Sequence, residues 1–223
     1  MMHQRISKKI VVYLLIFFSL VTINNKKLSN DFYIIKKFKI NGLNSSEAEK
    51  IFDDLKIFIN TSIFLFDEKK ISTKIYSNKE VEKLKVFKNY PSTLNIEIQK
   101  TKFLASTKKN NNDYYVGANG NFIKADKINF DLPFIFGKVD IKNFLHFKEI
   151  IDQSNFRFSD IKNLYYFKSN RWDVVTNNGL TLKMPSNLTV EKLNLIFKII
   201  QKSDFNDSKI IDYRQNNMIV INE

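Results

Sequence analysis

An uninterrupted apolar run near the start of the chain constrains its fold and location more than any other feature. Residues 10–23, IVVYLLIFFSLVTI, hold no charged side chain, and Ser19 and Thr22 are mild polar breaks. Three basic residues precede the run, a layout typical of a secretion signal or a signal anchor. At about 1.5 Å per residue the run spans roughly 21 Å, which is shorter than the roughly 30 Å hydrocarbon core of a bilayer.

The residues directly after the run favour an anchor that is retained. They are Asn24, Asn25, Lys26 and Lys27. A signal peptidase site needs small side chains, which these residues lack. Lysines at both ends can also snorkel toward water and so lengthen the membrane helix. We therefore predict a transmembrane anchor over residues 10–27, with a cleaved signal peptide and a buried core helix as alternatives.

The orientation of this anchor is predicted from its position. The charge rule gives little guidance, because basic residues lie on both sides of the run and large domains translocate largely regardless of charge. A hydrophobic run after a short basic tail more often directs the rest of the chain outward. We expect residues 1–9 in the cytoplasm and the bulk of the chain outside it, which in a bacterium with two membranes is the periplasm.

Composition bears on the kinds of site that the chain can hold. The formal net charge is +13, but lysine is spread along the chain together with asparagine, isoleucine and phenylalanine, as expected of AT-rich codons. A solvated basic surface is therefore a better interpretation than a nucleic-acid-binding face, which stays as the alternative. The chain has no cysteine, which excludes disulfides, thiolate metal sites and cysteine nucleophiles.

The residues after the anchor predict a strand and an amphipathic helix. The strand is Phe32–Ile40, and it stops at the turn pair Asn41-Gly42. Ser46 and Glu49 have the spacing of a capping box, which indicates a helix start. The apolar residues of this helix recur at helical spacing and indicate one buried face. They are Ile51, Phe52, Leu55, Phe58 and Ile59.

A second helix and a strand pair complete this first domain. The helix is predicted to start after Asp67. The strands begin near Val81 and near Thr93, with strict alternation of apolar residues in the second, and the turn between them contains Pro91. The order is strand, helix, helix, strand, strand, so residues 32–101 predict a compact α+β unit.

Residues 102–223 predict a mixed β-rich domain with two helices. Asn119-Gly120 has the chemistry of a tight hairpin turn, as does Asn177-Asn178-Gly179. Helices are predicted over residues 143–153 and 190–201, and a final strand ends at residues 219–221.

An ordered set of motifs resembles the FtsQ/DivIB family of bacterial cell division proteins. The segment FKINGLNSSEAEKIFDDL and, later, VEKLKVFKNYPSTLNIEIQKTKFLA are similar to the family's POTRA domain, although Lys100 and Phe103 replace its usual Glu and Pro. Further similarities continue in register to the end of the chain. They are the hairpin Tyr114–Ile123, the segment Asp131–Gly137, the hairpin Arg171–Pro185 and the segment Lys209–Arg214.

This resemblance implies a fold and a role. The fold is α+β: a single N-terminal transmembrane helix, a POTRA domain of order β-α-α-β-β, then the β-rich domain. The role is that of a scaffold at the division septum of the inner membrane, with FtsB- and FtsL-like proteins as partners and with no enzyme activity or cofactor. The resemblance also implies that the last strand lies at a sheet edge and accepts a strand from FtsB. The corresponding residues here are Tyr213, Arg214, Gln215, Asn217, Met218 and Val220; completing the core is the alternative role of residues 218–221.

Candidate catalytic and metal-binding residues are sparse. His146 is the one histidine after the tail, so a histidine-rich metal site in the body of the chain is excluded. Trp172 is interpreted as a core residue rather than a ligand platform, and no phosphate-binding glycine motif is present. Another POTRA-bearing exported assembly factor and an exported hydrolase remain as alternative functions.

Overall fold

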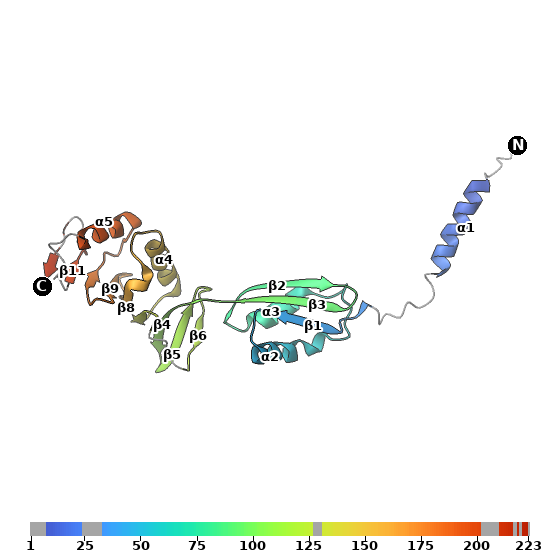
Figure 1. Ribbon diagram of the computed structural model, residues 1–223, viewed down its shortest axis with the longest axis horizontal. Coiled ribbons are helices and arrows are strands. Elements are labelled where there is room, and N and C mark those ends of the chain that lie inside the picture. Colours follow the sequence, from blue (N-terminus) through green and yellow to red (C-terminus); the bar gives the residue numbers. More distant parts are fainter. Residues whose placement is uncertain are drawn as a thin grey trace. The chain divides into compact units, whose positions relative to one another are not determined.

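The computed structural model describes residues 8–23, 33–126, 131–201, 210–215, 218 and 220–222. Contacts between Cα atoms divide the chain into two compact units. Unit 1 comprises residues 1–77 and 84–99, and unit 2 comprises residues 78–83 and 100–223. Figure 1 traces the chain through both units in order.

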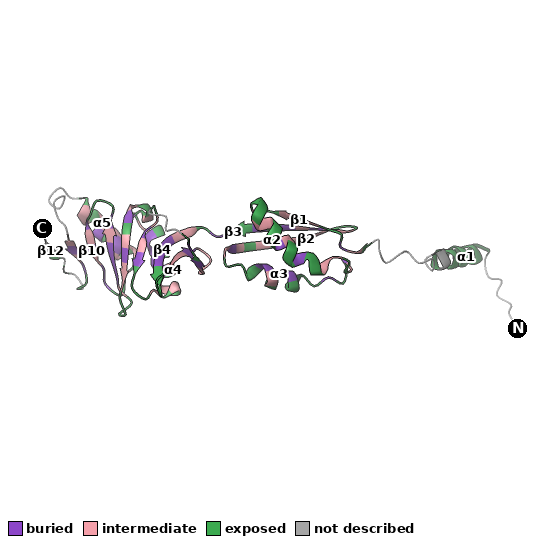
Figure 2. Cartoon of the chain, turned by 90° about the horizontal axis from the view of Figure 1, so that it is seen from below, coloured by how far each residue is buried: buried purple, intermediate pink, exposed green. Residues whose placement is uncertain are grey.

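The apolar run forms helix α1 (Lys8–Ile23), which has 16 residues. Its side chains are exposed as far as they are described, on every side of the helix (Figure 2). The expected anchor extends to residue 27, but residues 24–27 lie outside the described part. Among the described residues, none of the helices combines the length and the apolar character that crossing a bilayer requires. Within the described residues the transmembrane helix predicted from the sequence is therefore not found, and the helical segment there is about 24 Å long.

Apart from α1, unit 1 is built on a three-stranded sheet with two helices on one face, although the first residues of its strand β2 (Val81–Asn89) are counted with unit 2. The sheet has the order β1-β3-β2, in which β1 (Lys37–Asn41) runs parallel to β3 (Thr93–Lys100) and β2 lies at the other edge. The helices are α2 (Ser45–Leu55), continued by the short 3-10 helix η2 (Lys56–Phe58), and α3 (Glu68–Tyr76). The order of elements agrees with the predicted β-α-α-β-β pattern.

The core of unit 1 follows from the alternation seen in the sequence. Leu94, Ile96 and Ile98 of β3 are buried, as are Ile51 and Leu55 of α2 and Ile71 and Ile75 of α3. Apolar residues at period 2 on the strand and near period 3.6 on the helices thus meet in one layer.

The start of α2 differs from the prediction by two residues. The cap is Asn44, whose Oδ1 accepts a hydrogen bond from the N–H of Glu47 at 2.9 Å, while Oε2 of Glu47 accepts one from the N–H of Asn44 at 3.2 Å. Asn44 and Glu47 have the same spacing as Ser46 and Glu49, so the sequence offered two capping boxes. The predicted one was wrong because the helix starts directly after the turn at Gly42.

Unit 2 contains a nine-stranded sheet of order β12-β11-β10-β9-β8-β7-β4-β5-β6. One end of it comprises β4 (Phe103–Lys109), β5 (Asn112–Gly117), β6 (Phe122–Lys124) and β7 (Phe134–Phe136). The other comprises β8 (Ile161–Tyr166), β9 (Trp172–Thr176), β10 (Thr181–Lys183), β11 (Ile210–Asp212) and β12 (Val220–Asn222). The predicted hairpins are β5–β6 and β9–β10.

Helices α4 (Ile141–Asp152) and α5 (Val190–Ile200) pack on one face of this sheet, and the 3-10 helix η3 (Phe158–Asp160) precedes β8. Phe144, Phe147 and Ile151 of α4 and Leu193 and Ile196 of α5 form one core with the sheet. The strand residues in that core include Ile135, Leu164, Val174, Leu182 and Ile211, which are neighbours in the register of successive strands.

Trp172 belongs to this core, as the sequence indicated. Its side chain is 5% exposed and its ring stacks on Phe147, with the centroids 5.0 Å apart. Phe144 and Tyr166 also contact the indole. The interpretation of Trp172 as a packing residue is confirmed.

The start of unit 2 is held by a side chain whose role was not predicted. Nδ2 of Asn119 donates hydrogen bonds to the carbonyl oxygens of Lys79 and Val81, at 2.9 and 3.0 Å. The hairpin turn at Asn119 thereby fixes the segment that leads into β2. Close by, Nζ of Lys100 lies 2.7 Å from Oε2 of Glu80, and Phe103 stacks on Tyr115, so both residues that depart from the family pattern have structural contacts.

Candidate partner-binding edge

The strand order places β12 at one end of the large sheet. β12 pairs antiparallel with β11, and β11 pairs parallel with β10. Within the described part of the chain, the second long side of β12 has no strand beside it. Such an edge presents backbone N–H and C=O groups that a further strand can pair with.

A row of charged residues crosses the three strands beside this edge. The register aligns Asp173 of β9, Lys183 of β10 and Asp212 of β11. Val220 of β12 continues the row. These residues lie on the face opposite the helices, because the alternate row of Val174, Leu182 and Ile211 is buried in the core. Opposite charges thus lie on adjacent strands, an arrangement that favours pairing.

Two arginines complete the cluster. Arg214 donates from Nε to both carboxylate oxygens of Asp212, at 2.8 and 2.9 Å, and its Nη2 makes a further contact with the same group. Nε of Arg171 lies 3.2 Å from Oδ1 of Asp173, an ion pair whose atoms are not aligned for a hydrogen bond. The fork of Arg214 on a carboxylate is a geometry that only a guanidinium provides.

The two carboxylates have opposite pKa shifts. Burial raises the pKa of the Asp173 carboxyl above its ordinary value, although the charges of Arg171 and Arg214 act in the opposite direction. The hydrogen bonds from Arg214 lower the pKa of Asp212, and the same contact raises the pKa of Arg214. The cluster is therefore most strongly paired at Asp212, next to the edge strand.

A hollow of about 390 Å³ opens beside the cluster. It is lined by Arg171, Asp212, Arg214, Gln215, Met218 and Val220. Met218 and Val220 are 55% and 48% exposed, so these apolar side chains are accessible rather than buried in the core. The hollow combines two cations with exposed apolar surface along the free edge.

The structure brings most of the predicted binding residues together. Arg214, Gln215, Met218 and Val220 line the hollow, and Asn217 lies outside the described residues. Tyr213 differs, because its side chain is 6% exposed and belongs to the core. Its backbone N–H donates to the carbonyl oxygen of Lys183 at 2.8 Å, which extends the pairing of β10 with β11.

Arg171 and Asp173 were missed as members of this site. They lie about forty residues before β11 in sequence, and the resemblance placed them in a hairpin only. The one signal in the sequence is that Asp173 interrupts an apolar strand, Trp172 to Val175, which is unusual for a buried charge.

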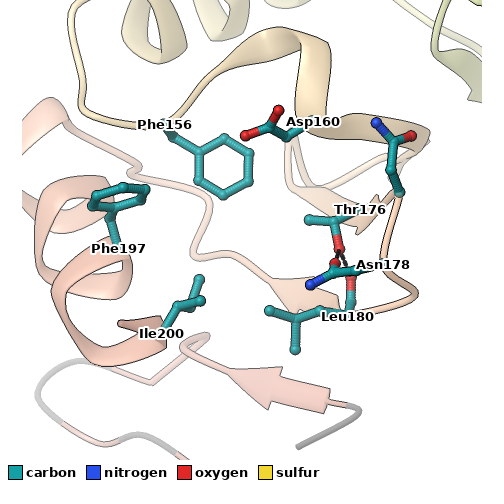
Figure 3. A pocket seen from close by; sticks show the side chains of 8 residues that line it. Phe156, Asp160, Thr176, Asn178, Leu180, Phe197 and Ile200 are labelled. Carbon is teal, nitrogen blue, oxygen red and sulfur yellow. Dashed lines mark hydrogen bonds between the residues drawn. The ribbon is translucent and has the colours of Figure 1, made fainter. Parts of the chain in front are cut away.

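A second hollow, of about 240 Å³, lies between α5 and the β9–β10 turn (Figure 3). Phe156, Phe197 and Ile200 form its apolar side, and Asp160, Thr176 and Asn178 lie across from them. The polar groups there have partners within the protein: Oδ2 of Asp160 accepts from Nε of Arg157, and Oγ1 of Thr176 donates to the carbonyl oxygen of Leu180. Because these polar groups are already paired within the protein, the hollow has little capacity to bind a polar ligand.

Chemistry of other kinds has little support in the described residues. They contain no group of three or more histidine, cysteine or acidic residues placed to hold a metal ion. The His146 side chain is 72% exposed on α4, in contact range of Glu149.

Comparison with known families agrees with this architecture. The model of the FtsQ-type POTRA domain matches residues 34–100. The model of the C-terminal region of the cell division protein FtsQ/DivIB matches residues 105–214. The chain belongs to the FtsQ/DivIB family. FtsQ/DivIB proteins are non-enzymatic interaction scaffolds of cell division that are associated with the membrane at the septum, so family membership assigns the chain a role in cell division.

Part of this FtsQ/DivIB protein also matches a solved structure. It is the major extracytoplasmic domain of the trans isomer of DivIB from Geobacillus stearothermophilus, at 14% identity. The match covers 48% of this chain and 98% of that one, with a TM-score of 0.35. A search of curated proteins found no significant match.

Proposed function

We propose that the chain is a membrane-associated scaffold of the divisome that binds an FtsB-like partner by strand addition to β12, and through it an FtsL-like protein. The observation that carries the proposal is the position of β12 at the end of the sheet, with an exposed, partly apolar hollow beside it. An incoming strand would pair with the backbone of β12, and its alternate side chains would enter or pass the hollow.

The exposure of residues 218 and 220 supports a partner over the alternative of core completion. A residue that only completes a core is removed from solvent in the free protein, whereas Met218 and Val220 are about half exposed. Each is apolar and each lies beside a cation-lined hollow. This combination suits a partner strand that carries an apolar and an acidic side chain on one face.

Membrane association is the second part of the proposal. After Lys8 and Lys9 at its start, helix α1 is apolar on every side, and such a helix in a globular protein is either buried in a core or in contact with lipid. We propose contact with lipid, with residues 1–9 in the cytoplasm, residues 32–101 and 102–223 as two domains outside it, and no catalytic activity in either.

The experiment is co-purification of the full-length protein with an FtsB-like partner from detergent extracts. Proline in place of Gln215 removes a backbone donor and perturbs the segment between β11 and β12. We expect Gln215→Pro to abolish co-purification while the melting temperature and circular dichroism stay nearly unchanged.

A matched control comes from the opposite edge of the same sheet. Lys124 lies in β6, the other terminal strand, so Lys124→Pro perturbs an edge without touching the proposed site. Co-purification that survives Gln215→Pro would contradict strand addition at β12. Joint loss of binding and folding would favour the core alternative instead.

A further inference from the structure

Unit 1 exposes an apolar cluster at one end of its sheet. Tyr33, Phe64, Leu65 and Tyr90 are 41%, 56%, 88% and 56% exposed. The ring of Phe64 lies 5.0 Å from that of Tyr33 and stacks on that of Tyr90 at 5.1 Å. We call these four residues the aromatic end.

Three segments that are distant in sequence build the aromatic end. The N–H of Ile63 donates to the carbonyl oxygen of Tyr33, and the N–H of Ile35 to that of Thr61, both at 2.9 Å. The N–H of Lys36 donates to the carbonyl oxygen of Ser92 at 2.8 Å, which joins the turn after Tyr90 to the same end. In Figure 1 the start of β1 and the arrowhead of β2 lie at this end of the unit.

Buried residues hold the exposed side chains of the aromatic end in place. Ile63 and Phe66, on either side of Phe64 and Leu65, are 0% and 8% exposed. The chain therefore buries Ile63 and Phe66, and it directs the side chains of the two residues between them outward. Exposed apolar groups that are clustered and held in place mark interaction surfaces more often than scattered ones do.

The position of the aromatic end in the chain indicates what it contacts. Nine residues, 24–32, separate Tyr33 from Ile23, the last residue of α1. At roughly 3.5 Å per residue, the aromatic end lies within about 35 Å of the end of that apolar helix along the chain. Lys26 and Lys27 lie in the same stretch, and Lys36 is exposed beside the cluster.

Tyrosine, phenylalanine and leucine with adjacent lysines are the composition of protein surfaces that sit at the level of lipid headgroups. The two carboxylates that follow this segment in the sequence have contacts of their own: Asp67 caps α3 through the N–H of Lys69, and Glu68 lies 3.8 Å from Nζ of Lys88. The exposed surface of these four side chains is also smaller than the roughly 800 Å² that each partner buries in a typical stable protein interface.

We propose that the aromatic end of unit 1 inserts shallowly into the lipid headgroup region beside α1. This inference rests on the proposed membrane association of α1. The insertion would give the POTRA domain a second point of attachment, so that its orientation at the membrane is set by Leu65 and the three rings rather than by the connecting residues alone.

The absence of native cysteine allows single-site labelling of the full-length protein. Leu65→Cys carries an environment-sensitive fluorophore in protein reconstituted into phosphatidylethanolamine–phosphatidylglycerol vesicles. Tyr76→Cys is the matched control, because Tyr76 is a 48% exposed aromatic at the other end of α3. Leu15→Cys, in α1, reports on the helix itself.

We expect the Leu65 probe to be quenched by spin-labelled lipid with a shallow label and protected several-fold from aqueous iodide, relative to the Tyr76 probe. If the Leu15 probe contacts lipid while the Leu65 probe behaves like the Tyr76 probe, the proposed insertion of the aromatic end is wrong and the membrane association of α1 stands. If none of the three probes contacts lipid, the proposed association fails and the insertion with it. Protection of the Leu65 probe from iodide without quenching by lipid would assign the surface to a protein partner or a second copy and so overturn the proposal.

Discussion

At the scale of single residues, Gly42 shows how a turn is tied to the sheet that it enters. Its φ of +92° is one that only glycine adopts without strain, and a Cβ there would lie 1.8 Å from the carbonyl oxygen of Ile98. We expect Gly42→Ala to lower the free energy of unfolding of unit 1 by more than about 2 kcal/mol, because backbone strain and steric overlap add.

Gly179 provides the matched control for this prediction. Its φ is +90°, but a Cβ there would meet no atom within 4 Å. Gly179→Ala therefore adds the strain without the overlap, and a cost of about 1 kcal/mol is expected. If urea denaturation showed the same loss of unfolding free energy for both variants, the steric overlap with Ile98 would make no contribution and the prediction would be wrong.

A second prediction at this scale concerns the pH dependence of Asp212. Hydrogen bonds from Arg214 lower its pKa in the folded state. A lowered carboxyl pKa contributes stability above the pKa of the unfolded chain, and this contribution is lost as the pH falls through the folded-state pKa. Asp212→Asn should therefore lower the melting temperature at neutral pH, and the difference from the parent protein should vanish in acid.

The control for this substitution is Asp126→Asn, since Asp126 is exposed. Thermal melts of both variants between pH 3 and pH 7 check the prediction. A difference for Asp212→Asn that persists unchanged at the acid end would contradict it.

At the scale of elements, β3 is the strand around which unit 1 is built. It lies between β1 and β2, and Ile96 at its centre is 0% exposed. Ile96→Asp places a carboxylate in the core, so we expect a loss of several kcal/mol or failure of the unit to fold. The exposed neighbour Glu97, changed to Ala, serves as the control in the same melting experiment, and an unaltered melting curve for Ile96→Asp would contradict the strand assignment.

At the scale of the whole molecule, the proposed topology is open to direct measurement. A reporter that is active only in the periplasm, fused after Glu223, should be active, because the two domains are proposed to lie outside the cytoplasm. N-terminal sequencing of the mature protein should show that the residues before Asn24 are retained. A mature chain that begins near Asn24 would show that the apolar run is a cleaved signal instead.

The sequence by itself determined the elements and their family. Alternation in β3, the helical spacing in α2 and the turns at Asn41-Gly42 and Asn177–Gly179 depend on neighbours within a few residues, so they are readable without a structure. The ordered motifs extended this to the FtsQ/DivIB family, which the family comparison confirmed. Even locally, two competing signals led to an error at the start of α2, where Asn44 and not Ser46 is the cap.

Only the tertiary structure decided which residues meet. The parallel pairing of β11 with β10 aligns Asp212 with Lys183 and brings Arg171 to the same hollow, although no local pattern relates these positions. The same pairing buries Tyr213 while Met218 and Val220 remain accessible. The aromatic end likewise joins residues 33, 64 and 90. Cross-strand register and the meeting of distant segments are set by the free energy of the whole packed unit, which is why they cannot be read from the chain in order.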